Sequence, residues 1–482
     1  MWRGILRIHR YLGVAVGVLI AAWCLSGIVM MYVPYPAFDR SDELRALERL
    51  TLDQCCIVTA GPGSTDPITS AGVIDHFEVE MSGGRPVLRL ATATEGVRQV
   101  DLTTGQGMDH VSVDQAKQIA AAFRQRLGID GTSDFRGAVE RDQWTVQSTY
   151  RAHRPLYKFA ATDDASTEWY VSSRTGQVVQ VTTGSQRFWN GLGAIPHWFY
   201  PTTLRQHTAA WSQTLIWATV LALFLTVTGM LVGVKRVRLR TDVATSPYRG
   251  WALWHHYAGL VFGLLTLTWL FSGLLSMNPW GALEGRSYAA ERDRLRGTGL
   301  GGQQLRDHIS SLSGRSVPGH TVRLEGSLFL GQPVLLAWSA DGVATRLNPT
   351  SLLPEELTEA AFHEAVLRLR PGAQIAAEGW QLTEDAYYYS PHDTRDFPVY
   401  RVRYADGERI YLDAVSGALL QGTDAARRQS RWLFNALHSW DFLALARSRP
   451  AWDAVMLLLL CGVTLSAASG VVLAKRRLLR RR

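Results

Sequence analysis

Residues 9–27 read HRYLGVAVGVLIAAWCLSG, and residues 255–273 read HHYAGLVFGLLTLTWLFSG. The two stretches share a histidine, glycines four and eight residues after it, and a Trp-x-x-Ser-Gly ending. A second set of residues also repeats: His197, Trp211, Gly229 and Arg236 recur as His438, Trp452, Gly470 and Arg477. We interpret the repetition as a duplication in which each half brings its own histidines to apolar helices.

Four long apolar runs predict membrane-spanning helices. The runs extend over Tyr11 to Val33, Ala209 to Val234, Tyr257 to Met277, and Ala454 to Ala474. Each has about 20 residues or more without a charged side chain, which suffices to cross a hydrocarbon core of about 30 Å. The first run is expected to remain as an anchor, because no A-x-A-like cleavage site follows it and a near copy lies in mid-chain.

Basic residues gather at one set of helix ends. The N-terminus, the short segment after the second run and the C-terminal tail together carry fourteen Lys and Arg residues against one Asp. The whole chain has a net charge of only +8, so its remaining parts are acidic on balance. The positive-inside rule therefore predicts that both termini and the short segment are cytoplasmic. Because the excess positive charge belongs to one membrane face, it does not indicate nucleic-acid binding.

The predicted organisation alternates single helices with two large loops across the membrane. The segments are residues 1–33 (helix), 34–208 (loop domain), 209–234 (helix), 235–254 (cytoplasmic loop), 255–277 (helix), 278–451 (loop domain), 452–474 (helix) and 475–482 (basic tail). Strand–turn–strand patterns at 97–107, 168–181 and 409–421, with helix-like stretches at 113–127 and 355–369, predict α+β loop domains. Each half starts and ends inside, so the halves are expected to be parallel, related by a pseudo-twofold axis along the membrane normal.

His9 and His255 are the first candidate ligands. Gly13 and Gly17 follow His9 on one helical stripe, as Gly259 and Gly263 follow His255. An imidazole beside a flat glycine groove suits a porphyrin plane, and the pseudo-twofold axis would make the two histidines face each other. This pattern predicts a bis-histidine site for b-type haem. The alternatives are that the histidines are interfacial side chains and that the small residues serve only helix packing.

His197 and His438 form a second pair near the opposite membrane face. They could ligate a second haem, or they could be interfacial residues with aromatic neighbours. Met31 and Met277, also equivalent in the repeat, are alternative ligands there. His153 and His392 align within the loops and are expected to be structural or near a substrate. Cys55 and Cys56 could be oxidised, although neighbouring cysteines rarely bridge each other. No CxxCH motif occurs, which excludes covalent c-type haem.

These motifs resemble the PepSY-associated transmembrane family of bacterial inner-membrane proteins, which includes ferric-siderophore reductases. The resemblance rests on H-R-Y-x-G and W-x-x-S-G in the first span, their copies in the third, the hairpin from Asp413 to Gly417, and Leu437-His438. The halves differ, because Ser172 replaces the hairpin Asp and Pro196 precedes His197. The two loop domains are therefore not expected to be equivalent.

The resemblance implies an inner-membrane oxidoreductase with two haem b groups and PepSY-like domains in the periplasm. Such a protein would take electrons from a cytoplasmic or membrane donor and pass them to a periplasmic ferric siderophore, with membrane lipid as its other partner. The competing hypothesis is a non-enzymatic membrane protein whose PepSY domains bind or regulate a periplasmic partner.

Overall fold

The computed structural model describes residues 2–53, 55–58, 68, 73–92, 96–238, 245–390, 395–442 and 448–479. The chain divides into two compact units, which we call the helical unit and the β-rich unit. The helical unit comprises residues 1–35, 185–285 and 425–482, and the β-rich unit comprises residues 36–184 and 286–424. Each unit therefore contains segments from both halves of the sequence repeat.

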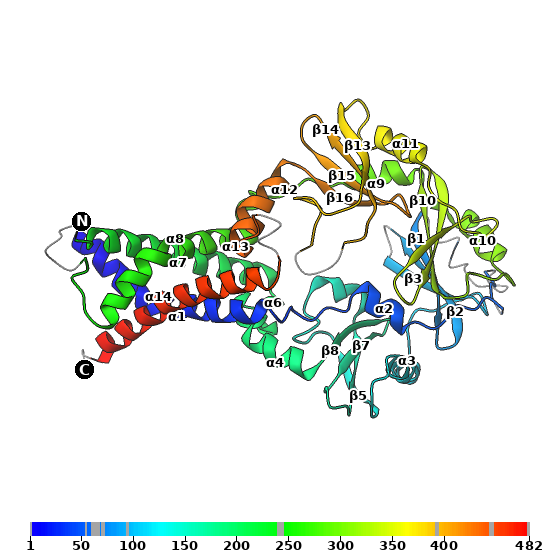
Figure 1. Ribbon diagram of the computed structural model, residues 1–482. Coiled ribbons are helices and arrows are strands. Elements are labelled where there is room, and N and C mark those ends of the chain that lie inside the picture. Colours follow the sequence, from blue (N-terminus) through cyan, green and yellow to red (C-terminus); the bar gives the residue numbers. More distant parts are fainter. Residues whose placement is uncertain are drawn as a thin grey trace. The chain divides into compact units, whose positions relative to one another are not determined.

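Four long helices dominate the helical unit (Figure 1): α1 (Trp2–Met30), α7 (Thr208–Lys235), α8 (Trp251–Ser276) and α14 (Ala451–Leu479). All four are long and apolar enough to cross a membrane, which confirms the predicted spans and makes this a multi-pass membrane protein in contact with lipid. Helix α1 begins before its apolar run and α14 continues after its run, because helical hydrogen bonding continues through the basic residues there. His9 consequently lies in the third turn of α1.

The two halves of the helical unit repeat one another in their contacts. Helix α1 packs against α7 and α14, and α8 packs against the same two helices. The indole of Trp211 donates to the Trp198 carbonyl at 2.7 Å, and the equivalent indole of Trp452 donates to the Ser439 carbonyl at 2.8 Å. These shared contacts show that the sequence repeat is also a structural repeat of a two-helix unit.

Shorter helices flank the long ones. In the helical unit they are α4 (Gly184–Leu192), α5 (Ala194–His197), α6 (Thr202–Arg205), the 3₁₀ turn η3 (Pro279–Gly281), α12 (Ala425–Ser430), the π-helical segment η4 (Arg431–Ala436) and α13 (Leu437–Ser439). His197 is the last residue of α5, and His438 lies in α13. Each of these two histidines thus lies on a short helix that precedes the second long helix of its half, which we call the returning helix: α7 for His197 and α14 for His438.

The largest sheet of the β-rich unit contains strands from both loops (Figure 1). Its order is β12-β11-β10-β1-β2-β3-β4, and β9 pairs with the end of β1. The strands are β1 (Val73–Ser82), β2 (Arg85–Thr92), β3 (Gly96–Asp101), β4 (Gln106–Gly107), β9 (Leu300–Gly301), β10 (Thr321–Phe329), β11 (Gln332–Ser339) and β12 (Ala344–Leu347). The antiparallel pairing of β1 with β10 joins the two loops into one continuous sheet.

The two faces of this sheet differ in chemistry. Alternate residues such as Phe77, Val79 and Leu324 are buried in an apolar core, because successive strand side chains point to opposite faces. Their neighbours Glu78, Glu80 and others on the second face are charged. Helix α2 (Arg40–Ala46), capped at its N-terminus by Asp39, contributes further charged side chains to that second face.

Two four-stranded antiparallel sheets complete the β-rich unit. One runs through β5 (Ser133–Val139), β6 (Leu156–Ala161), β7 (Glu168–Ser172) and β8 (Val178–Thr182), and the other through β13 (Ile375–Gln381), β14 (Val399–Tyr404), β15 (Arg409–Asp413) and β16 (Leu419–Thr423). Helix α3 (Val113–Arg126) shares a core with the first sheet, and α11 (Glu359–Leu369) with the second. Helices α9 (Ala289–Arg296) and α10 (Gly302–Ser311) precede β10.

Local sequence signals explain where α3 and α11 begin. Ser112 and Gln115 form a reciprocal capping box at the start of α3. Thr358 caps α11 by accepting a hydrogen bond from the Ala361 amide. The predicted helices and the strand pairs around Gly176 and Gly417 are confirmed, as is the α+β class of the loops. The structure also joins Cys55 to Cys56 in a disulfide, although the adjacency of the two cysteines argued against one.

Candidate cofactor site

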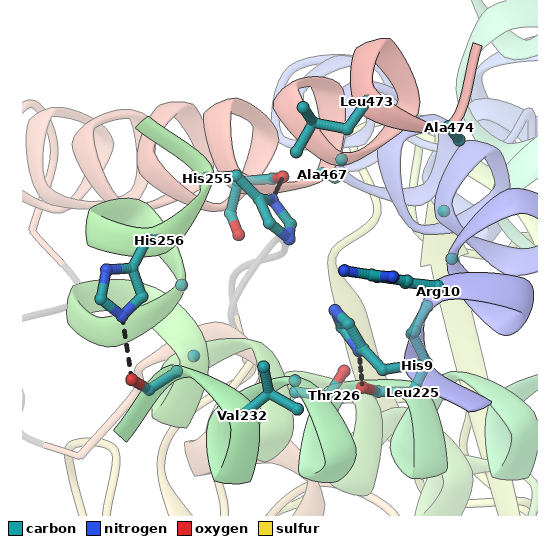
Figure 2. Close-up of a pocket in the computed structure, with 18 of the residues that line it drawn as sticks. His9, Arg10, Leu225, Thr226, Val232, His255, His256, Ala467, Leu473 and Ala474 are labelled. Carbon is teal, nitrogen blue, oxygen red and sulfur yellow. Dashed lines mark hydrogen bonds between the residues drawn. The ribbon is translucent and has the colours of Figure 1, made fainter. Parts of the chain in front are cut away.

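The first predicted histidine pair meets between the long helices. The ring centroids of His9 and His255 lie 6.2 Å apart, with 28° between the ring planes. His9 Nδ1 lies 3.2 Å from the Leu225 carbonyl of α7, and His255 Nδ1 lies 2.9 Å from the Ser466 carbonyl of α14. Leu225 and Ser466 are equivalent in the repeat. Figure 2 shows the two imidazoles reaching into one cavity from different helices, each anchored by this contact to the returning helix of its own half.

These contacts decide which imidazole nitrogen is available. A carbonyl only accepts hydrogen bonds, so each Nδ1 must carry the proton and donate it. The proton on Nδ1 leaves a lone pair on Nε2, which no hydrogen bond among the described residues engages. A histidine whose Nδ1–H is held by a backbone carbonyl and whose Nε2 is available has the outer-sphere arrangement usual for metal-bound histidine.

Glycines form a wall behind both rings. A Cβ atom placed on Gly229 of α7 would lie 2.6 Å from His9 Cε1, and one on the equivalent Gly470 of α14 would lie 3.1 Å from His255 Cε1. In the sequence these two glycines stand out only as repeat markers. Their role was hidden because each contacts a histidine more than 200 positions away in the chain. The available signal was that Gly229 and Gly470 occupy equivalent positions on α7 and α14.

A cavity of about 380 Å³ opens between the histidines. The four glycines predicted to border the cofactor, Gly13, Gly17, Gly259 and Gly263, all line it. Three further glycines also line it: Gly229, Gly233 and Gly470. The side chains of Arg10 and Arg477 also border the cavity, and Figure 2 shows Arg10 beside His9. The volume lies in the usual range for small-molecule and cofactor sites. The lining combines two nitrogen donors, a smooth apolar wall and two cationic groups.

The second predicted pair also meets. The ring centroids of His197 and His438 lie 6.3 Å apart, with 75° between the planes. His197 Nδ1 lies 3.1 Å from Ser26 Oγ, and His438 Nδ1 lies 3.0 Å from Ser272 Oγ. Each serine hydroxyl donates to the carbonyl of the residue three positions earlier, so its oxygen accepts from the imidazole. Both imidazoles are therefore protonated on Nδ1 and keep a lone pair on Nε2.

These contacts explain the Trp-x-x-Ser-Gly motif. The serine fixes the histidine tautomer, and the following glycine leaves room for the ring, since a Cβ on Gly27 would lie 3.6 Å from His197 Cε1 and one on Gly273 would lie 3.7 Å from His438 Cε1. Trp23 further donates its indole N–H to the His197 carbonyl at 3.0 Å. The sequence showed the motif as a repeat and as part of the family resemblance, but not its role, because the histidine that it contacts lies on a distant segment.

The two histidine pairs lie near opposite ends of the helical unit. His9 and Ser26 are both in α1, and the helical rise places them roughly 26 Å apart along its axis. That separation approaches the hydrocarbon thickness of about 30 Å. The pairs are therefore positioned toward the two faces of a membrane that α1 crosses.

The remaining candidates do not join either pair. Met31 is buried in the helical core, and Met277 follows the last residue of α8, whereas the close neighbour of His197 is a histidine ring. His153 lies in the β-rich unit near Thr175, and burial lowers the pKa of its imidazole. His392 lies outside the described residues.

Both pairs have a spacing that fits one metal ion between two imidazoles. Two metal–nitrogen bonds of about 2 Å each, added to the radii of the two rings, give a centroid separation of roughly 6 Å. The observed separations are 6.2 and 6.3 Å. Around His9 and His255, the flat glycine-lined cavity and the arginines fit an anionic macrocycle better than a bare ion, because a bare ion needs no such space.

Fold and site together define a multi-pass membrane protein with histidine pairs between duplicated helices. The chain belongs to the PepSY-associated TM region family, whose model matches residues 6–311. No curated protein matches the chain.

Proposed function

We propose that the protein is a haem-b-containing membrane oxidoreductase that passes electrons across the inner membrane to ferric chelates. The observation that carries this proposal is the pairing of four histidines into two sets, 6.2 and 6.3 Å apart, each with Nδ1 engaged and Nε2 available. Haem iron held by two imidazoles supplies one-electron transfer. Neither pair needs an acid or base for that chemistry.

The residues would divide the work of holding the cofactor. His9 and His255 would hold the haem iron, and the glycine wall would leave room for the haem. Arg10 and Arg477 would offset the negative charge of its carboxylates. His197 and His438 would hold a second group, with Ser26 and Ser272 fixing the donor nitrogens. This arrangement provides one site near each membrane face.

The direction of transfer follows from charge placement. The basic termini and the segment after α7 favour a cytoplasmic location for the end that bears His9 and His255. A cytoplasmic or membrane donor would then deliver electrons at that end, and the β-rich unit would lie in the periplasm. One electron per ferric ion yields ferrous iron, which binds hard oxygen ligands less strongly and is released more readily. The family resemblance favours a ferric siderophore as the acceptor.

The test is stopped-flow reoxidation of the dithionite-reduced protein by a panel of ferric hydroxamates, catecholates and citrate. We expect the reduced haem spectrum to decay at a rate that depends on chelate concentration, with ferrous iron trapped by ferrozine in equal amount. His9→Ala should remove one haem's share of the reduced spectrum, whereas His207→Ala, at an exposed histidine just before α7, should leave the spectrum and its decay unchanged. Protein that is colourless when purified from haem-replete cells would refute the proposal and favour the non-enzymatic PepSY alternative.

A further inference from the structure

A charged cluster on the eight-stranded sheet has the composition of a metal site. His76 and Glu78 lie two residues apart on β1 and so share one face of the sheet. Glu325 of β10 stands directly opposite Glu78 in the antiparallel register. His76 Nε2 lies 3.2 Å from Glu78 Oε1 and 3.7 Å from Glu325 Oε1, and the three potential ligand atoms lie within 4.8 Å of one another.

We propose that His76, Glu78 and Glu325 bind a divalent transition-metal ion. Metal–ligand bonds of about 2.1 Å in tetrahedral geometry place ligand atoms roughly 3.4 Å apart, which requires only small side-chain movements here. One imidazole and two carboxylates are ligands that Zn²⁺ and Fe²⁺ both accept. The proposal does not depend on haem or on electron transfer, because the cluster belongs wholly to the β-rich unit.

The charge balance of the surrounding network favours a cation. Ion pairs connect four carboxylates to three guanidinium groups: Glu43, Glu78, Glu80 and Glu325 with Arg40, Arg89 and Arg323. With His76 neutral, as a metal-bound imidazole must be, one negative charge is left over in this network. Glu78 and Glu325 also stand directly opposite each other on β1 and β10, and like charges in that position destabilise a sheet. A bound divalent ion between Glu78 and Glu325 would remove that repulsion.

Glu78 is held between two neighbouring side chains. Its Oε1 lies 3.2 Å from His76 Nε2, and its Oε2 lies 4.0 Å from Arg323 Nε. Glu325 is oriented by the indole N–H of Trp338, which donates to its Oε2 at 2.6 Å and leaves Oε1 toward His76. Both carboxylates are therefore set in place by neighbouring side chains.

Access to the cluster is controlled by Arg40. This side chain pairs with Glu325 Oε1 and lies over the Trp338 ring, with its guanidinium carbon 4.0 Å from the ring centroid. The Arg40 side chain is 48% exposed, so its guanidinium can turn to solvent when a metal ion takes its place beside Glu325. The His76 side chain is 36% exposed, so water can complete the coordination sphere.

The experiment measures zinc binding by the full-length, untagged protein in detergent through equilibrium dialysis. We expect His76→Ala and Glu325→Gln each to bind one zinc ion fewer than the parent, or to bind it at least tenfold more weakly. Other histidines that bind zinc are present in parent and variant alike, so the difference isolates this site. The matched control is His363→Ala, which removes an exposed histidine paired with Glu378 and should bind like the parent.

A second measurement keeps the test decisive if a variant folds poorly. Cobalt added to the parent should give visible d–d absorption that one equivalent of zinc abolishes, and Glu325→Gln, which preserves side-chain shape, should lack this signal while keeping its circular dichroism. Equal zinc stoichiometry and affinity in the parent, both site variants and the control would overturn the proposal. Anaerobic titration with ferrous iron then compares the two metals at the same site.

Discussion

Gly229→Ala tests the geometry around His9 most sharply. The added Cβ would lie 2.6 Å from His9 Cε1 and 3.1 Å from His9 Nδ1. Since carbon atoms pack at about 3.5 to 4.0 Å, the imidazole must retreat by roughly 1 Å. That movement pulls Nδ1 away from the Leu225 carbonyl and misplaces Nε2. Overpacking of this kind costs about 1 to 3 kcal/mol, which corresponds to roughly 5- to 150-fold weaker haem binding.

The assay is haem content per chain, measured as pyridine haemochromogen, together with haem titration of the apoprotein. Two variants calibrate the result. Gly470→Ala places its Cβ 3.1 Å from His255 Cε1 and should have a smaller effect. Gly4→Ala meets nothing within 4 Å and should bind haem normally. Alanine favours a helix over glycine by about 1 kcal/mol, so a loss cannot come from helix propensity. Equal haem binding by Gly229→Ala and Gly4→Ala would refute the reasoning.

Three further predictions follow from the same structure. His197→Ala should remove one haem and leave the other spectrally intact, as read from reduced-minus-oxidised spectra; loss of both or of neither would contradict separate sites. Arg323→Ala should lower the free energy of unfolding of the β-rich unit by about 3 to 5 kcal/mol, because it removes an ion-pair partner of Glu80, which is 2% exposed. Urea titrations followed by tryptophan fluorescence measure this loss, and a loss below about 1 kcal/mol would count against that account. The pKa of Glu78, lowered to about 2, implies a stabilising contribution that is complete above its unfolded pKa of about 4.3 and is lost as the pH falls toward 2. Glu78→Gln should therefore destabilise the protein at pH 6 but hardly at pH 2.5, and an effect independent of pH would exclude this linkage.

The sequence predicted the helical unit well because its signals are local. Apolar length identified α1, α7, α8 and α14, and the repeat placed His9 with His255 and His197 with His438. Helix ends were less accurate, since α14 continues to Leu479 whereas the predicted helix ended at residue 474. Charged residues stop a hydropathy run without stopping a helix.

Contacts between distant segments could not be inferred in the same way. The pairing of β1 with β10 joins residues about 245 positions apart, and neither strand's alternation specifies its partner. The contact between Ser26 and His197 is similar, because the serine lies in a membrane helix and the histidine in a short helix near the next one. Such contacts depend on how the segments pack, which a single sequence does not state.

The most direct test of the central claim is the haem-to-protein ratio of the wild-type chain purified from haem-replete cells. The paired histidines predict two b-type haems per chain, both low-spin and both reduced by dithionite. Protein without haem, or with absorbance that persists at the same intensity when His9 and His197 are both replaced by alanine, would contradict the assignment of the two pairs as cofactor ligands.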